Sequence, residues 1–234
     1  MPNKTILTSG AAVALLAGSA ALAGVVGPAV RARQEPGYTI LLPHHGASLL
    51  YDQNEDDAGV AVRAENFESE LDAYDTEAAD DFTVPSGQTW KISEVFVAGI
   101  LFEGSRSADS FNVTFYWSRK GKIGKAVKSC LNAGYRFDTP FDFGAEYITC
   151  KAKLKSGAYF VAVQANTEFF EGGEWGWLTN STVRGNPSMW RNPGGGYGTG
   201  CTDFAPTTTC YPGEEGGDFA FALYGRASTA GAAD

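Results

Sequence analysis

The sequence predicts an all-β fold, and more finely a jelly-roll-like sandwich of two antiparallel sheets with eight or nine strands. Large apolar residues alternate with polar ones at period two in several segments, which is the pattern of a strand with one buried face. Turn residues separate these segments at short intervals, and long amphipathic helices do not recur. Because 44% of the residues are hydrophobic and 13% are aromatic, the chain can build one sizeable core, and we expect one domain.

The N-terminal segment predicts export. Lys4 precedes an uncharged stretch, residues 5–30, that is rich in Ala, Gly, Leu and Val. Residues 1–32 therefore have the composition of a signal peptide. Small residues allow cleavage after Ala23 or after Ala32. A retained membrane anchor is the alternative, but Ala and Gly drive membrane insertion weakly.

The remaining chain divides into three parts. Residues 33–48 contain two Pro and two Gly and are predicted to form a linker. Residues 49–225 carry the strand pattern and are predicted to form the β-sandwich domain. Residues 226–234 are rich in Ala, Ser, Thr and Gly, so we expect a flexible tail.

Within the domain, the clearest strand covers residues 111–118, where large apolar side chains occupy alternate positions: Phe111, Val113, Phe115 and Trp117. Residues 90–102 are apolar on both faces, which predicts a central strand with a bend or bulge at Gly99. Further strands are predicted at Asp80–Val84, Ala126–Leu131, Arg136–Phe143, Tyr147–Lys151, Tyr159–Gln164, Trp175–Leu178 and Phe219–Tyr224. Turns are predicted at Pro85-Ser86-Gly87, at Gly121 with Gly124, at Ser156-Gly157 and at Gly172-Gly173. Only Glu65–Tyr74 has a helical pattern, and it is short.

The chain has four cysteines, Cys130, Cys150, Cys201 and Cys210. An even number of cysteines in an exported chain favours two disulfides over thiolate chemistry. Three connectivities are possible. Pairing of nearest neighbours, Cys130 with Cys150 and Cys201 with Cys210, is favoured because each pair flanks a short excursion that a disulfide can close.

The charge of the chain argues against polyanionic partners. Removal of residues 1–32 takes away two of the 18 basic residues and none of the 27 acidic ones, so the mature chain is more acidic than the formal net charge of −9. Nucleic-acid binding needs a basic stripe, and none is visible in the sequence. We therefore expect no nucleic-acid partner, no membrane association after removal of the signal, and a secreted monomer.

Three segments together resemble a group of secreted bacterial β-sandwich modules that occur alone or attached to larger extracellular proteins. They are Asn66-Phe67-Glu68 with the stretch Asp72–Phe82, then Trp190–Cys201 with its sequence WRNPGGGYGTGC, and the closing strand Phe219–Leu223. The resemblance extends from about Leu49 to Gly225. It implies export and a β-sandwich architecture, and it implies no activity or catalytic residue.

Histidine is nearly absent, which excludes several classes of enzyme site. His44 and His45 are the only two histidines, and both lie in the predicted linker. A histidine-based triad or a His/Cys zinc site is therefore not expected within the domain.

The acidic segment near the start of the domain predicts a candidate calcium site. Twelve Asp and Glu residues between positions 52 and 81 face one basic residue, Arg63. Bound Ca²⁺ takes six to eight oxygen ligands and would relieve the repulsion among them. Asp52, Asn54 and Asp56 have the spacing that opens a calcium loop, although the rest of an EF-hand pattern is missing. The alternative is a solvated acidic loop without a metal.

An aromatic Gly-rich segment predicts a candidate sugar site. Aromatic rings offer an apolar surface to a sugar ring, and neighbouring amides can bond its hydroxyls. The candidate ligand-binding residues are Trp190, Tyr197, Asn192 and Trp175. Trp175 shares one strand face with Trp177, a spacing more typical of a core, whereas Trp190 and Tyr197 lie in a Pro/Gly loop that could expose them.

Three functions fit the sequence. The leading hypothesis is a secreted, non-enzymatic module that binds a polysaccharide or cell-surface glycan. The second is a structural or accessory extracellular domain without a small ligand. The third is a glycoside hydrolase that uses two carboxylates among Glu168, Glu171 and Glu174, beside the aromatic segment.

Overall fold

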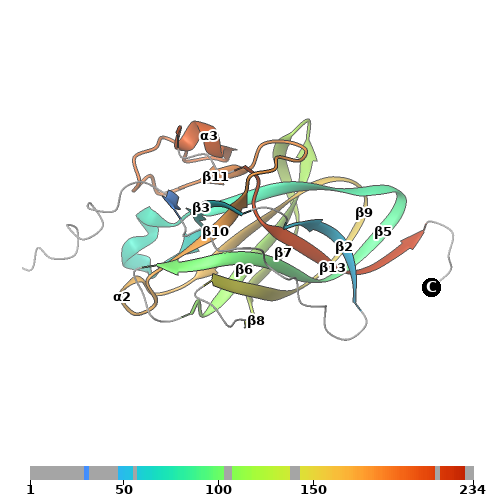
Figure 1. The fold of residues 1–234 in the computed structure, drawn as a ribbon, viewed down its shortest axis with the longest axis horizontal. Coiled ribbons are helices and arrows are strands. Elements are labelled where there is room, and N and C mark those ends of the chain that lie inside the picture. The colour runs from blue at the N-terminus through green and yellow to red at the C-terminus, as the bar shows by residue number, and fades with distance from the viewer. Residues whose placement is uncertain are drawn as a thin grey trace, which may run out of the picture.

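A computed structural model describes residues 29–31, 47–54, 57–102, 107–137, 143–213 and 217–229. Strands dominate these residues, so the all-β prediction is confirmed (Figure 1). The strands are β1 (Ala29–Arg31), β2 (Ser48–Gln53), β3 (Asp57–Arg63), β4 (Glu65–Asn66), β5 (Glu77–Phe102), β6 (Ser110–Arg119), β7 (Lys122–Ala133), β8 (Tyr135–Phe137), β9 (Phe143–Asn166), β10 (Glu174–Asn180), β11 (Met189–Arg191), β12 (Ala205–Pro206) and β13 (Phe221–Thr229). The helical segments are a 3-10 helix η1 (Ser69–Tyr74) and the one-turn helices α2 (Phe169–Gly172) and α3 (Thr207–Cys210). In this part of the chain, no helix has the length and apolar character needed to cross a membrane.

The finer prediction, two separate sheets with eight or nine strands, is wrong. All thirteen described strands belong to one hydrogen-bonded sheet, whose main path runs β1-β3-β10-β5-β9-β6-β7. The reason is that β5 and β9 are 26 and 24 residues long. Each contains two of the predicted strands together with the turn that was expected to separate them.

Both long strands bend where the sequence predicts turns. β5 and β9 pair in antiparallel fashion from Ala78 opposite Val163 to Ile100 opposite Phe143, with a register shift after Val84. The bends contain Gly87, with φ of 76°, and Gly157, with φ of 150°, and Gly adopts such backbone angles more easily than other residues. The strands can therefore turn without ending, and Figure 1 shows β5 turning back beside the C-terminal strand β13.

The bends fold the single sheet over on itself into two layers. In the first layer, residues 77–84 of β5 and 157–166 of β9 continue into β6, β7 and β11. In the second layer, residues 89–102 of β5 and 143–155 of β9 continue into β13, β2, β10 and β3. The sequence therefore predicts the pattern of a two-layered core, although hydrogen bonds connect the layers along two strands.

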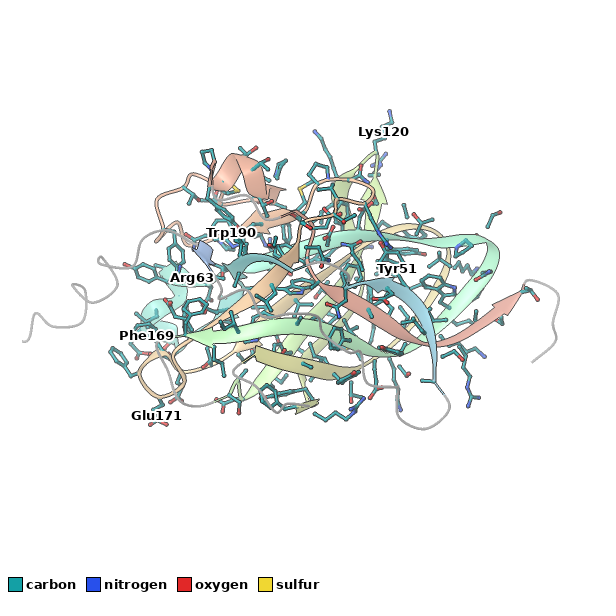
Figure 2. The ribbon with its side chains drawn as sticks, viewed as in Figure 1. Tyr51, Arg63, Lys120, Phe169, Glu171 and Trp190 are labelled. Carbon is teal, nitrogen blue, oxygen red and sulfur yellow. A yellow bond between two sulfur atoms is a disulfide. The ribbon has the colours of Figure 1, made fainter. Side chains whose placement is uncertain are left out.

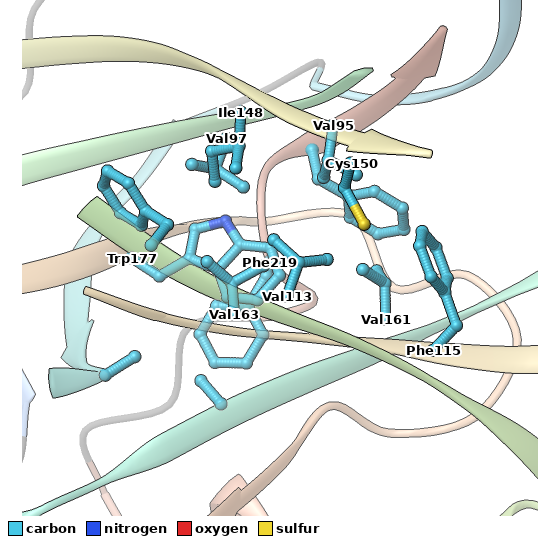
Figure 3. Packing of buried hydrophobic residues seen from close by; sticks show 14 of the residues in the cluster. Val95, Val97, Val113, Phe115, Ile148, Cys150, Val161, Val163, Trp177 and Phe219 are labelled. Atoms are coloured by element: carbon cyan, nitrogen blue, oxygen red, sulfur yellow. The ribbon is translucent and has the colours of Figure 1, made fainter. Parts of the chain in front are cut away.

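The main hydrophobic core lies between the two layers. Figure 3 shows Val113, Phe115, Val161 and Val163 of the first layer close to Val95, Val97, Ile148 and Cys150 of the second. Their burial confirms the face predicted for Phe111, Val113 and Phe115. Alternate residues of the same strands point outward, where two smaller apolar clusters lie, one around Phe96 and Tyr147 and one around Phe160.

Two further predictions differ from the structure. Residues 65–74 form β4 and η1 in place of a regular helix. Arg226–Thr229, placed in the flexible tail, continue β13 and pair with residues 88–91 of β5. β1 pairs with β3 and falls inside the predicted signal peptide, so cleavage after Ala23 would retain it and cleavage after Ala32 would remove it. His44 and His45 lie outside the described residues.

The disulfides are those that nearest-neighbour pairing predicts. Cys130 is bonded to Cys150, and Cys201 to Cys210. Cys130 belongs to β7 in the first layer and Cys150 to the second-layer half of β9, so this bond cross-links the two layers. The second disulfide closes a surface loop between β11 and α3.

We predict that the interlayer disulfide contributes about 3 kcal/mol to the free energy of unfolding, because it closes a loop with a sequence separation of 20 residues. Urea unfolding of Cys130→Ser/Cys150→Ser against the oxidised wild type measures this. The matched variant Cys201→Ser/Cys210→Ser, with a separation of 9, should lose less. Equal midpoints for the wild type and the Cys130 variant would contradict a cross-link between the layers.

Candidate functional site

The aromatic segment predicted to bind sugar is packed inside the protein. Trp190 has no exposed surface, and its indole N–H donates to the carbonyl of Arg63 at 2.9 Å. Trp175 and Trp177 are also buried, which confirms the core interpretation for this pair. The prediction that Trp190 is a surface ligand is therefore wrong, and Figure 2 shows it close to Arg63 in the body of the fold.

Asn192 explains why the Pro/Gly loop folds inward. Its side-chain amide donates to the carbonyls of Ala73 and Asp75, both at 2.8 Å, and its carbonyl oxygen accepts from the backbone N–H of Tyr197 at 3.0 Å. Asn192 is buried and thus joins the loop to the end of η1. Tyr197 is half-buried, with its ring edge against Tyr74. All four predicted sugar ligands therefore have partners within the fold.

The carboxylates proposed for hydrolysis do not share an accessible site. Glu174 is buried and forms an ion pair with Arg63 at 2.7 Å. Glu65 lies beside this pair and accepts a hydrogen bond from the backbone N–H of Trp175. Burial, followed by the negative charge of Glu174, raises the pKa of Glu65 well above its usual value. Glu168 and Glu171 are exposed at the start and in the middle of the α2 turn, and Figure 2 places Glu171 at the periphery.

A second buried carboxylate joins four parts of the chain. Asp80 accepts from the side chain of Gln53 at 2.8 Å, from the backbone N–H of Phe219 at 2.6 Å and from that of Asp81 at 2.8 Å. Asp81 in turn accepts from the backbone and side chain of Asn186. Asp80 and Asp81 are therefore not part of a solvated loop, and they connect β2, β5, the β10–β11 connection and the start of β13.

The predicted calcium residues do not form a metal site among the described residues. The backbone N–H of Asn54 donates to Asp52 at 3.1 Å, which is a local turn, and Asp56 lies outside the described residues. In the described ranges, no group of three or more His, Cys, Asp or Glu side chains has a metal-binding arrangement. Calcium binding thus stays a prediction from the sequence.

Strand pairing builds a basic surface that the sequence does not show directly. In the stretch Lys151-Ala152-Lys153-Leu154-Lys155, the alternation buries Ala152 and Leu154 and exposes the three lysines on the outer face of the second layer. Lys91 on β5 lies directly opposite Lys153, and Arg226 on β13 lies directly opposite Lys91. We define Lys91, Lys151, Lys153, Lys155 and Arg226 as the lysine face; all five side chains are exposed.

The lysine face has a regular geometry and one sign of charge. Neighbouring strands lie about 4.8 Å apart, and alternate residues of one strand about 6.7 Å apart. The outer-face neighbours in the adjoining row are the uncharged Thr89 and Ser228. The nearby acid on the same face, Glu94, forms an ion pair with Arg136 at 3.4 Å. Like charges directly opposite each other disfavour a strand pair, so an anion bound over this row would reduce the repulsion between them.

The positions of these cations explain why sequence reasoning missed the surface. The alternation of lysines at 151, 153 and 155 is visible in the sequence and could have predicted a basic strand face. Lys91 and Arg226 come from distant segments, and only the pairing of β13, β5 and β9 brings them together. The finding corrects the expectation that the fold carries no basic stripe.

No protein-family model matches the sequence, and comparison with curated proteins finds no significant match. The resemblance to secreted β-sandwich modules therefore stays a prediction, and the function has to be inferred from the geometry.

We predict that Glu174→Gln lowers the free energy of unfolding by about 3 to 5 kcal/mol, because it leaves the guanidinium of Arg63 buried without its carboxylate. Glu168→Gln, which changes an exposed carboxylate nearby, is the matched control and should stay within about 0.5 kcal/mol of the wild type. Denaturant unfolding at neutral pH measures both. A loss below 1 kcal/mol for Glu174→Gln would argue against a sealed ion pair.

We predict that stability falls as pH rises, in part because of Glu146. Burial raises the pKa of Glu146 from 4.5 to about 8, while the indole N–H of Trp175 donates to it at 3.2 Å. The folded protein thus holds this proton more tightly than the unfolded chain. Its contribution is complete below pH 4.5 and is lost as pH rises to about 8, by up to about 1.4 kcal/mol per pH unit.

The test is the pH dependence of urea unfolding for Glu146→Gln. Glutamine keeps an acceptor for Trp175 but does not titrate, so the variant should lose less stability than the wild type between pH 5 and pH 8. Equal slopes for the two proteins would show that Glu146 is not buried in its neutral form.

Proposed function

We propose that this chain is a secreted, non-enzymatic binding module that attaches to an acidic polysaccharide through the lysine face. The observation that carries the proposal is the row Arg226, Lys91 and Lys153, three cations side by side on adjacent strands of an otherwise acidic protein. Two disulfides support an oxidising compartment outside the cytoplasm.

Protection of a sheet edge is the ordinary reason for lysines on strands, and it does not account for Lys91. Lys91 belongs to β5, which is hydrogen-bonded to β9 on one side and to β13 on the other. The lysines are also not needed to keep the net charge away from zero, because the chain is strongly acidic. A role in binding an anion accounts for both facts.

The chemistry of the face favours a polysaccharide over other polyanions. A membrane-binding surface needs apolar side chains that insert between lipids, whereas the neighbours of the row here are Thr89 and Ser228. A nucleic acid has a dense charge along its length and would meet the acidic remainder of the protein. An acidic glycan carries spaced carboxylates or sulfates and can lie across a face that is only a few strands wide.

The alternatives from the sequence have less support. For a carboxylate-based hydrolase, Glu174 is enclosed in its ion pair with Arg63. A structural domain without a ligand would explain the buried hydrogen bonds of Asp80 and the Arg63–Glu174 ion pair. It gives no reason for the row Arg226, Lys91 and Lys153. Absence of binding in the experiment below would favour that structural role.

We predict that Lys151→Gln/Lys153→Gln/Lys155→Gln weakens binding to polygalacturonate about a hundredfold, since each lysine near an anionic surface contributes about 1 kcal/mol. Binding of the wild type should also weaken as salt rises, because a higher ionic strength shortens the range of charge interactions. Titration calorimetry or retention on immobilised polygalacturonate measures the affinity.

The control has the same change in net charge at other exposed sites: Thr202→Glu/Thr208→Glu/Thr209→Glu. This variant should bind nearly as well as the wild type. If both triple variants lose the same affinity, only net charge matters, and the lysine face is not the binding site.

A further inference from the structure

One tryptophan is exposed, and it is not one that the sequence suggested. Trp117 is 41% exposed, whereas the other four tryptophans of the chain are at most 3% exposed. It stands at the end of the alternating row of β6, after Phe111, Val113 and Phe115, which are fully buried. The covering layer therefore ends before Trp117.

The indole of Trp117 is held in a fixed position. Trp117 lies directly opposite Tyr159 of β9, and the two rings stack with centroids 4.5 Å apart at an interplanar angle of 24°. Tyr159 is buried, and its hydroxyl donates to the carbonyl of Lys155 at 2.8 Å. A flat ring supported in this way loses little conformational entropy when a ligand covers it.

Glycine makes room for this ring at the bend of β9. A Cβ atom on Gly157 would lie 2.9 Å from the indole of Trp117, which is too close for a carbon contact. The φ of 150° at Gly157 also disfavours other residues. The bend of the long strand and the aromatic surface therefore depend on the same glycine.

Two lysines of β7 lie on the hairpin that carries the exposed ring. On β7, Lys128 is directly opposite Phe115, so it shares the face of β6 that carries Trp117. Gly124 and Lys125 lie between Ile123 and Ala126, which pair with Ser118 and Tyr116, so this pair of residues stands across from Trp117. Both lysines are exposed. The β6–β7 hairpin projects from the body, with Lys120 at its tip in Figure 2.

The basic hairpin and the lysine face are neighbours. The hydrogen bond from Tyr159 brings the backbone of Lys155 next to the Trp117 stack. The Cα atoms of Cys130 and Cys150 lie 5.7 Å apart, and Lys128 and Lys151 are within two residues of these cysteines. The exposed ring thus lies at the edge of the fold, between the basic hairpin and the strand that carries the lysine face.

We propose that Trp117 is the sugar-stacking subsite of the glycan surface, with Lys125 and Lys128 of β7 and Lys155 of β9 on the neighbouring strands to bind carboxylates or sulfates along the same sugar chain. This inference rests on the proposed function and adds the ring that would recognise a pyranose. The apolar C–H face of a sugar fits the exposed indole, and the acidic groups of the same sugar chain fit the lysines. A single ring among cations is too small an apolar surface for a hydrophobic protein interface.

Fluorescence gives a direct test, because Trp117 is the exposed emitter among the five tryptophans. Acrylamide, a neutral quencher, should reach Trp117 in the free protein and be excluded from it by saturating polygalacturonate. Trp117→Phe should remove the accessible fraction of the emission. Unchanged quenching in the presence of bound polysaccharide would overturn the proposal.

Affinity separates this subsite from the lysine face. Trp117→Ala should weaken binding to polygalacturonate about tenfold, whereas Trp117→Phe should retain most of the affinity. Polyphosphate has no sugar ring, so its affinity should be the same for the wild type and Trp117→Ala. Circular dichroism of each variant confirms that it folds, and Trp117→Phe keeps the test valid if Trp117→Ala does not.

The outcomes distinguish the two proposals. Equal binding of polygalacturonate by the wild type, Trp117→Ala and Trp117→Phe would refute the stacking subsite and leave the lysine face standing. Failure of the wild type to bind any acidic polysaccharide would refute both. Dextran sulfate beside polygalacturonate shows whether sulfate or carboxylate is preferred, and stronger binding of neutral dextran than of either would contradict the assigned role of the lysines.

Discussion

The pairing of β5 with β9 is the constraint on which the other features of this fold depend. These strands remain hydrogen-bonded from Ala78 opposite Val163 to Ile100 opposite Phe143, and they change layer together at Gly87 and Gly157. If either strand ended at its bend, the layers would be separate sheets held only by side-chain packing. Because both continue, the two layers share the backbone of β5 and β9, and the Cys130–Cys150 disulfide adds a covalent link between β7 of the first layer and the second-layer half of β9.

The same bend places both parts of the proposed binding surface. Before the bend of β9, the strand exposes Lys151, Lys153 and Lys155 on the outer face of the second layer. After the bend, Tyr159 enters the core and supports the indole of Trp117. A straight strand would put a longer distance between the lysines and the aromatic stack. Lys155 and Tyr159 are only four residues apart in β9, and the pairing of β6 with β9 brings Trp117 from a distant segment onto Tyr159.

Buried charged groups have a different role in this fold. Asp80 and the Arg63–Glu174 pair are removed from solvent, and each has several hydrogen-bond partners in segments distant in sequence. Buried charges of this kind add little net stability compared with apolar residues, but they make alternative arrangements costly, because any other arrangement would leave them unpaired. We infer that they fix how β2, β3, β10 and β13 attach to the long strands.

Local patterns in the sequence were sufficient for the disulfide pairing, for the buried face of residues 111–115 and for most of the longer strands, but they did not predict β2, β3 or the continuity of β5 and β9. They could not show where the covering layer ends, so Trp117 had the same signature as Phe111 although only Trp117 is exposed. The prediction for Trp190 was wrong in the opposite direction, because Trp190 was expected to be exposed and is buried. Its Gly- and Pro-rich surroundings are typical of an exposed loop, but the contacts of Asn192 with Ala73 and Asp75 draw that loop onto the fold.

The net charge of the chain did not predict the lysine face for a related reason. Net charge averages over the whole surface, whereas a ligand contacts only one face. Twelve acidic residues lie between positions 52 and 81, whereas positions 119 to 155 are rich in lysine. In the row Arg226, Lys91 and Lys153, like charges face each other across three strands. An anion that binds over this row in the folded protein would stabilise the fold, by an amount set by its affinity and concentration. The acidic remainder of the surface would repel the same ligand, which confines it to the face where the cations and the exposed indole meet.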